Sequence, residues 1–128
     1  MAENSIITKF RREQLAKVTS GQIASIDKIA YIALGDGGAT PEGTPIAPNE
    51  EQTALVNELK RYEVGAPEFP VSTTARYTIT VPEGELVGNK ISELGLLDAQ
   101  GKLCAVRNCS PKGKDADETF TFVFDDEF

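Results

Sequence analysis

The most regular apolar pattern of the chain lies between Ile91 and Asn108. Two apolar runs, Leu94–Leu97 and Leu103–Val106, flank the sequence Asp98-Ala99-Gln100-Gly101. Asp can open a turn through its side chain, and Gly can take a positive φ at the exit of the turn. The pattern therefore predicts a β-hairpin with a short loop.

Both arms of this hairpin carry apolar side chains on both faces. Strict alternation in the second arm places Leu103 with Ala105 on one face and Cys104 with Val106 on the other. A strand that is apolar on two faces needs cover on two sides. We therefore expect the hairpin to lie inside the domain.

Three further stretches have the pattern of strands. Ile26–Leu34 is apolar on both faces, whereas Ser72–Val81 alternates between apolar and polar residues, as in a strand with one face toward water. Thr119–Phe124 places Phe120, Phe122 and Phe124 on one side. These stretches predict a sheet that is mainly antiparallel.

Two stretches have the spacing of helices. Near residues 5–18, Ser5 can serve as the cap of a helix with a narrow apolar stripe, and Gly21 can end it. Near residues 49–62, Asn49 and Gln52 form a capping-box pair ahead of a second apolar stripe. The expected fold is α+β, a mainly antiparallel twisted sheet or small β-sandwich with two helices.

Residues 35–48, between the first of these strands and the second helix, are rich in Gly and Pro. Gly35-Asp36-Gly37-Gly38 fits no phosphate-binding spacing, and Pro41 stands where a calcium loop needs Gly. We expect a surface turn followed by an extended arm, and a charged loop at 110–118. No cofactor or metal is expected.

The composition limits the class of partner. The chain has 128 residues, so we expect a single domain over 1–128 with a short acidic end at 125–128. Its formal net charge of −7 argues against a nucleic-acid partner and against a membrane partner. The N-terminus lacks the features of a signal peptide. Without His to complete a zinc set, Cys104 and Cys109 are expected to be reduced and packed.

Candidate chemistry is sparse. The chain has no His, the commonest general base, and the acidic cluster of Asp115, Asp117 and Glu118 lies in a charged loop where ordinary pKa values are expected. Glu93 is unusual because it stands in an apolar arm and needs a donor. The candidate donors are Arg61, Arg76 and Arg107. We expect a structural ion pair, and no enzyme.

The first predicted helix carries four cations, Lys9, Arg11, Arg12 and Lys17. Two interpretations are open: a solvated face, or a basic docking face in a chain that is otherwise acidic.

Three motifs occur in a fixed order: Gly35-Asp36-Gly37-Gly38 after an apolar strand, Gln52–Glu58 with Arg61, and Ile91–Asp98 with Gly101. Together they resemble the phage tail-collar fibre family, the N-terminal domain of tail fibres in contractile-tailed phages and phage-tail-like bacteriocins. The resemblance spans roughly residues 6–108, and Ser92–Asp98 is its most specific part.

The resemblance implies a non-enzymatic virion component that attaches or organises tail fibres at the baseplate. It implies a homo-oligomer, usually a trimer, with baseplate proteins and a fibre or receptor-binding chain as partners, assembled in the host cytoplasm. The implied framework positions are Gly35, Asp36, Gly37, Gln52, Asn57, Glu58, Arg61, Glu93, Gly95, Asp98 and Gly101.

Family fibres continue into a shaft and a receptor-binding tip, whereas this sequence stops at Phe128. We therefore expect an adaptor whose fibre is another chain, or a piece of a longer fibre, with docking at Phe120, Phe122 and Phe124. Two alternatives stay open: a carbohydrate-binding module for a surface glycan, and a small carboxylate-dependent wall hydrolase.

Overall fold

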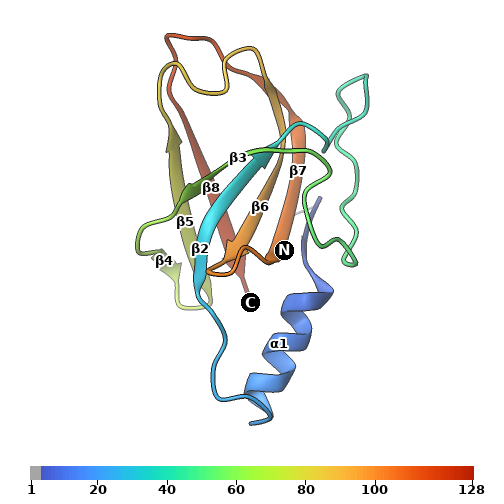
Figure 1. Ribbon diagram of the computed structural model, residues 1–128, viewed down its shortest axis with the longest axis vertical. Helices are drawn as coiled ribbons and strands as arrows, with labels where there is room; N and C mark the ends of the chain where they lie inside the picture. The colour runs from blue at the N-terminus through green and yellow to red at the C-terminus, as the bar shows by residue number, and fades with distance from the viewer. Residues whose placement is uncertain (1–3) are drawn as a thin grey trace.

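Two antiparallel sheets and one helix make up the described part of the chain, residues 4–128 of a computed structural model (Figure 1). A five-stranded sheet has the order β1-β7-β6-β2-β3, and a three-stranded sheet has the order β4-β5-β8. The elements are β1 (Ser5–Ile7), α1 (Lys9–Thr19), β2 (Ile29–Gly35), β3 (Glu58–Glu63), β4 (Glu68–Val71), β5 (Thr74–Val81), β6 (Lys90–Asp98), β7 (Leu103–Gly113) and β8 (Phe120–Glu127). The prediction of antiparallel sheets is confirmed, but the fold is mainly β.

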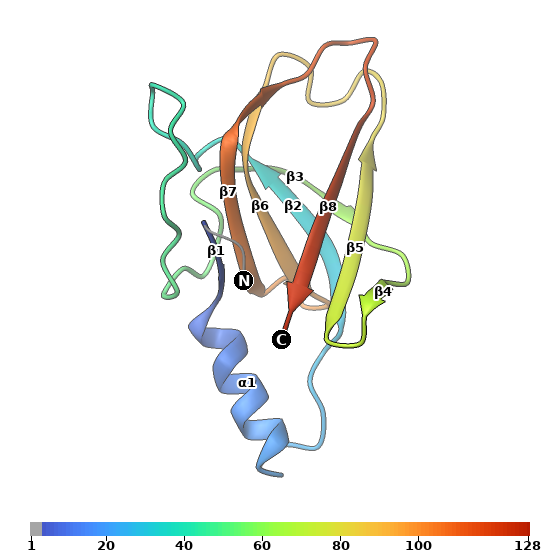
Figure 2. The same cartoon turned by 180° about the vertical axis from the view of Figure 1, so that it is seen from behind.

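The two sheets share one hydrophobic cluster. Strands β2, β6 and β7 contribute side chains from the larger sheet, and strands β5 and β8 contribute them from the smaller one. Figure 2 shows the strands of the smaller sheet in front of those of the larger one. Its fully or almost fully buried members include Ile32, Leu34, Leu94, Leu96, Ile79, Val81 and Phe124. Burial of this apolar surface is the main force that holds the sheets together.

The predicted hairpin is confirmed as β6 and β7. The Asp98 carboxylate accepts hydrogen bonds from the backbone N–H groups of Gln100 and Lys102, both at 2.9 Å. Gly101 takes the positive φ of +80° that the turn requires. The local chemistry of Asp and Gly thus determines where the chain reverses.

The strict alternation expected in the second arm is wrong at one point. The pairing jumps from Leu96↔Ala105 to Leu97↔Leu103, which leaves Cys104 as an extra residue in β7. Such a β-bulge changes the side-chain phase of the strand. Cys104 and Ala105 therefore both face the core between the sheets, while Leu103 and Val106 face the opposite side.

The outer face of β6 is covered as predicted, but by an irregular segment. Leu55 packs in a second cluster with Ala33, Leu97, Leu103 and Val106. Gly95 allows this approach, because a Cβ there would lie 2.7 Å from Leu103 Cδ1 and 3.1 Å from Leu55 Cδ2. Residues Ile91–Asp98 are consequently all buried.

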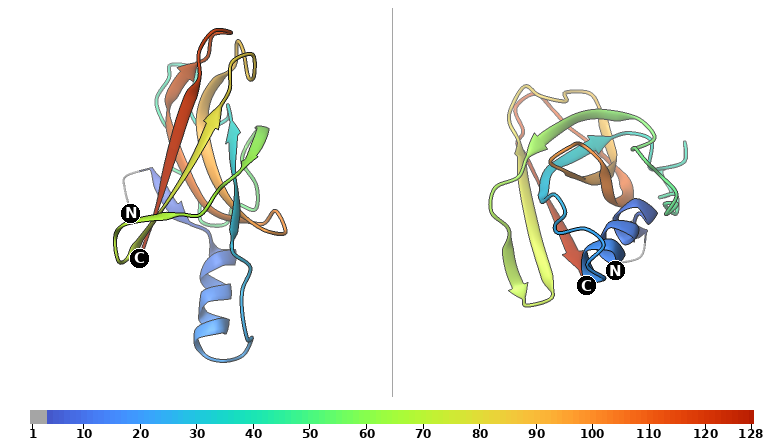
Figure 3. Two further views of the ribbon diagram at one scale, coloured as in Figure 1. Left: turned by 90° about the vertical axis from the view of Figure 1, so that its left-hand side faces the viewer. Right: turned by 60° about the horizontal axis from the view of Figure 1, so that its bottom comes forward.

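The first helix begins later than predicted. Residues Ser5–Ile7 pair with β7 as strand β1, and the cap is Thr8, whose side chain accepts the Arg11 N–H. Ser5 is therefore not the cap. The rest of α1 extends away from the two sheets (Figure 3), and none of its residues is buried.

The second predicted helix does not form. The Asn49–Gln52 capping pair is present, since the Asn49 N–H donates to Gln52 Oε1 at 2.9 Å and the Glu51 N–H donates to Asn49 Oδ1 at 2.8 Å. Beyond this turn the backbone N–H groups of Val56 and Asn57 donate to the Glu93 side chain. These amides are then unavailable to a helix, and the chain continues as strand β3.

Other boundaries differ by a few residues. Strand β7 continues to Gly113, so the charged loop is shorter than 110–118, and the connector near Pro67 includes the short strand β4. In β5 the alternation is confirmed, with Ile79 and Val81 buried and Thr78 and Thr80 exposed.

Candidate functional site

The Glu93 carboxylate is the point at which three distant segments meet. Its side chain is fully buried. Oε2 accepts the N–H groups of Gly37 at 2.8 Å and Asn57 at 2.9 Å, and Oε1 accepts the N–H of Val56 at 2.8 Å. We call Gly35, Gly37, Val56, Asn57 and Glu93 the Glu93 junction.

The predicted arginine partner of Glu93 is wrong. Arg61 makes a two-point pair with Glu58, Arg76 pairs with Asp125, and the Arg107 guanidinium lies 5.6 Å from the Phe124 ring centroid. Three backbone amides satisfy the buried carboxylate instead, because hydrogen bonds to a charged acceptor are short and strong. Glu93 is thus a tie between segments of backbone.

The glycines of the Gly-rich turn are needed for close approach. A Cβ on Gly35 would lie 2.5 Å from Glu93 Oε2, and a Cβ on Gly37 would lie 2.6 Å from Val56 Cβ. Real Cβ atoms essentially never approach other heavy atoms below 3.0 Å. Any side chain at these positions would therefore push the turn away from Glu93.

The arm at residues 36–48 is held at its base. The Gly38 N–H donates to Ser92 Oγ at 2.9 Å, and the Asn108 side-chain amide donates to the Ile46 carbonyl at 2.7 Å. Asn57 Nδ2 also donates to Asp36 Oδ1 at 2.6 Å. The base of the arm is therefore continuous with the Glu93 junction, while its outer part reaches away from the sheets (Figures 1 and 2).

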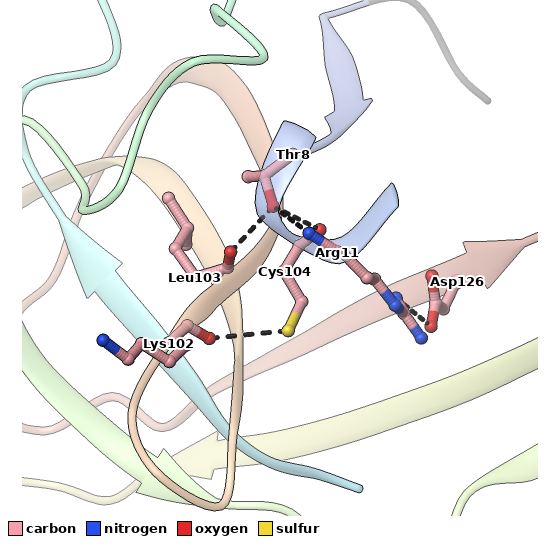
Figure 4. Close-up of polar contacts among 6 residues, drawn as sticks. All are labelled: Thr8, Arg11, Lys102, Leu103, Cys104 and Asp126. Atoms are coloured by element: carbon pink, nitrogen blue, oxygen red, sulfur yellow. Dashed lines mark hydrogen bonds and ion pairs between the residues drawn. The ribbon is translucent and has the colours of Figure 1, made fainter. Parts of the chain in front are cut away.

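A second polar cluster holds the start of α1 (Figure 4). The Thr8 hydroxyl donates to the Leu103 carbonyl at 2.8 Å, and its backbone N–H donates to the Cys104 carbonyl at 3.0 Å. Arg11 donates to Asp126 Oδ2 at 2.7 Å, with side chains that are only 11% and 1% exposed. This pair links the first turn of the helix to strand β8.

A family model described as phage tail-collar fibre protein, N-terminal, matches residues 1–121. The chain belongs to the phage tail-collar fibre family. Neither a curated protein nor a solved structure matches it. The match confirms the resemblance of the three sequence motifs and indicates a structural component of a phage tail.

The structure brings part of the implied tail-collar framework together. Gly35, Asp36, Gly37, Asn57 and Glu93 converge at the Glu93 junction or directly beside it. The other positions are separate from it: Gln52 closes the 49–52 turn, Glu58 and Arg61 pair on β3, Gly95 admits Leu55, and Asp98 and Gly101 form the hairpin turn.

The four cations of α1 have different surroundings. Arg11 is engaged with Asp126, Arg12 pairs with Glu50 at 2.8 Å, and Lys9 lies 3.6 Å from Glu51. Lys17 stands in the last turn, where a positive charge complements the helix dipole. A basic docking face is thus left mainly to the exposed Arg12 and Lys9 and the half-buried Lys17.

The phenylalanines of β8 do not form an exposed docking face. Phe122 and Phe124 are 5% and 1% exposed, and Phe120 packs against the same core. The alternation along β8 is confirmed, but its apolar side faces the core. Docking through these side chains is therefore incompatible with the fold of the chain.

The remaining candidate groups offer little chemistry. Asp115 and Asp117 are exposed, and Glu118 accepts the Asp115 N–H at 2.9 Å within a local turn. Within residues 4–128, no cluster of three or more His, Cys, Asp or Glu is placed to hold a metal ion, and no helix is both long and apolar enough to span a bilayer. Cys104 and Cys109 are both free thiols, as predicted.

Several residues of these clusters were not found from the sequence. Thr8, Ser92, Asn108 and Asp126 are buried and polar. Asp126 had a detectable signal, because it shares the alternation of Phe122 and Phe124 and therefore faces inward. Thr8 and Asn108 had none, since their partners are carbonyl groups of distant segments.

The Arg11–Asp126 pair leads to a pH-dependent prediction. Burial raises the pKa of the Asp126 carboxyl group, while Arg11 acts in the opposite direction. Replacing Arg11 by Gln leaves a buried carboxylate without its cation and should lower the free energy of unfolding by about 2 kcal/mol at pH 7, below the range for fully buried pairs. The measurement is urea denaturation.

The sign of the pH effect follows from proton linkage. A carboxyl group with a raised pKa in the folded protein binds protons more tightly there, so lowering the pH toward that pKa favours the folded state. The deficit of Arg11→Gln relative to wild type should therefore shrink between pH 7 and pH 4.5. The control repeats Arg11→Gln in an Asp126→Asn background, where the difference between the double variant and Asp126→Asn alone should not depend on pH. An equally constant deficit of Arg11→Gln relative to wild type would contradict the assignment.

Proposed function

We propose that this chain is a non-enzymatic structural component of a phage tail or phage-tail-like particle, which attaches or organises tail fibres at the baseplate by protein–protein docking. The observation that carries the proposal is the tail-collar match over residues 1–121. The proposed partners are baseplate proteins and a fibre or receptor-binding chain. The proposed state is a homo-oligomer, with the trimer as the form that the resemblance implies.

Helix α1 and the 36–48 arm are the proposed docking elements. Both extend away from the sheets, and both are held firmly at one end, by the Arg11–Asp126 pair and by the Glu93 junction (Figure 3). A projecting element with a fixed base can enter a groove of a neighbouring protein with little loss of conformational entropy on binding. Multiple copies on one particle would add avidity.

Charge reversal on α1 tests this proposal. The double variant Arg12→Glu and Lys17→Glu should reduce the number of copies incorporated per particle by about tenfold or more, since like charges at an interface weaken docking strongly. Arg11 is left unchanged because its loss affects folding. The measurement is quantitative mass spectrometry of particles purified from cells that carry the variant as the sole copy.

The matched control reverses two exposed cations of the edge strand β3, Lys60→Glu and Arg61→Glu, which belong to neither proposed docking element. It changes the net charge by the same amount and should leave incorporation unchanged. Equal incorporation of both double variants would remove α1 from the docking surface, and absence of the wild-type chain from particles would overturn the proposed function itself.

A further inference from the structure

The basic face of α1 is partly occupied by carboxylates of the chain itself. Arg12 donates to Glu50 Oε2 at 2.8 Å, and Lys9 Nζ lies 3.6 Å from Glu51 Oε1. The backbone N–H of Lys9 also donates to the Glu50 carbonyl at 2.8 Å. The 49–52 turn therefore lies against the start of α1, and residues of both elements line one open cleft.

The arrangement of these pairs shows which chemistry this face of the helix accepts. Glu50 and Glu51 are consecutive in the sequence, and their cations, Lys9 and Arg12, are three residues apart on α1. Positions three apart share one face of a helix, so two adjacent carboxylates reach both cations at once. A segment of another protein with two adjacent acidic residues has the same complementarity to this face.

Both ion pairs are open to exchange. The side chains of Arg12 and Glu50 are 64% and 51% exposed, and those of Lys9 and Glu51 are 57% and 62% exposed. Exposed ion pairs contribute little to stability, because water competes for the same groups. Replacing the two carboxylates of the turn by two from a partner conserves the number of ion pairs, and the fold does not depend on the exchange.

An external segment also gains a contact that the turn does not make. Lys17 lies eight positions after Lys9, about two helical turns along α1. Within residues 4–128 no carboxylate pairs with Lys17, whereas Glu50 and Glu51 lie beside the first turns only. The helix has four cations and one carboxylate, Glu13, in a chain with a net charge of −7. An acidic segment long enough to reach Lys17 therefore binds this face better than the turn does.

We propose that α1 binds an acidic protein segment with adjacent carboxylates, and that Glu50 and Glu51 occupy the face until this segment displaces them. The inference rests on the docking role proposed for α1 and adds the chemistry of the partner, a baseplate or fibre protein. Nucleic acid is the less suitable polyanion, because the chain outside α1 is strongly acidic and repels a phosphate backbone.

Binding of a fluorescein-labelled peptide of eight glutamates, followed by fluorescence anisotropy on the purified chain, tests the proposal. The double variant Glu50→Gln and Glu51→Gln removes the competing carboxylates and should bind the peptide about three- to tenfold more tightly than wild type, since each lost pair is an exposed one. Its urea midpoint should equal that of wild type, because these pairs do not hold the fold.

The matched control is Glu83→Gln with Asp117→Asn, which removes two exposed carboxylates from the loops after β5 and β7. It changes the net charge by the same amount and should change the affinity for the peptide less than about twofold, since long-range effects are screened by salt. In the opposite direction, Arg12→Glu with Lys17→Glu should weaken binding about tenfold or more.

The outcomes separate this inference from the attachment role. A Glu50→Gln and Glu51→Gln variant that binds no more tightly than the control, or that does not bind at all, would overturn the competition. Tighter binding of a single-stranded oligonucleotide of eight nucleotides than of the glutamate peptide would overturn the choice of a protein partner. Because the assay uses the free chain, absence of the chain from particles would overturn the attachment role and leave the binding result unchanged.

Discussion

Replacing Glu93 by alanine is expected to lower the free energy of unfolding by on the order of 5 kcal/mol. Three part-buried backbone N–H groups, of Gly37, Val56 and Asn57, lose their acceptor, and each group that water cannot reach costs about 1–3 kcal/mol. That sum is comparable with the whole stability of an ordinary domain. The measurement is urea or thermal denaturation followed by circular dichroism.

Glu93→Gln should be intermediate, at roughly half this loss. Its amide oxygen can keep the hydrogen bonds from Gly37 and Asn57, but its NH₂ group then faces the Val56 N–H, which is also a donor. Glu83→Ala is the control, because Glu83 is exposed in the turn after β5. A Glu93→Ala variant within about 1 kcal/mol of wild type would show that the junction does not hold the fold together.

Gly35→Ala is expected to cost at least about 3 kcal/mol, above the usual range for overpacking. The added Cβ would lie 2.5 Å from Glu93 Oε2 and 2.8 Å from Glu93 Cγ, and it would also strike the Asn57 carbonyl oxygen. Both neighbours are held by the hydrogen bonds of the junction, so neither can move without breaking one.

The matched control is Gly65→Ala. A Cβ at Gly65 would have no heavy atom within 4 Å, and its φ lies outside the left-handed region. This variant should be neutral or more stable by about 0.4–1 kcal/mol, through the lower entropy of the unfolded chain. Denaturation midpoints of the two alanine variants should move in opposite directions or differ widely; equal midpoints would exclude the predicted clash.

The sequence predictions that are confirmed depend on interactions between residues that are close in the sequence. The Asp98–Gly101 turn depends on a side chain that reaches two residues onward and on one glycine with positive φ, and both effects act within four residues. The 49–52 capping turn formed for the same reason.

Predictions that depended on a distant partner were less successful. The 49–62 stretch has the spacing of a helix, but Glu93 takes the amides of Val56 and Asn57 from 37 and 36 residues away. A buried carboxylate suggested an arginine, whereas backbone amides were the donors. The alternation of side chains along a strand identifies which side of β8 is apolar. It does not show whether that side packs against the core of the same chain or against another protein.

The sequence by itself determined the Asp98–Gly101 and 49–52 turns, most of the strands and the membership of the tail-collar family. Only the tertiary structure decided that Glu93 ties the Gly-rich turn to residues 56–57, that Arg11 holds α1 to β8, and that the phenylalanines of β8 face inward. The physical reason is the distance along the sequence over which each interaction acts. Turn and strand preferences act between neighbours, whereas a buried carboxylate selects its donors from every segment that the fold brings to it.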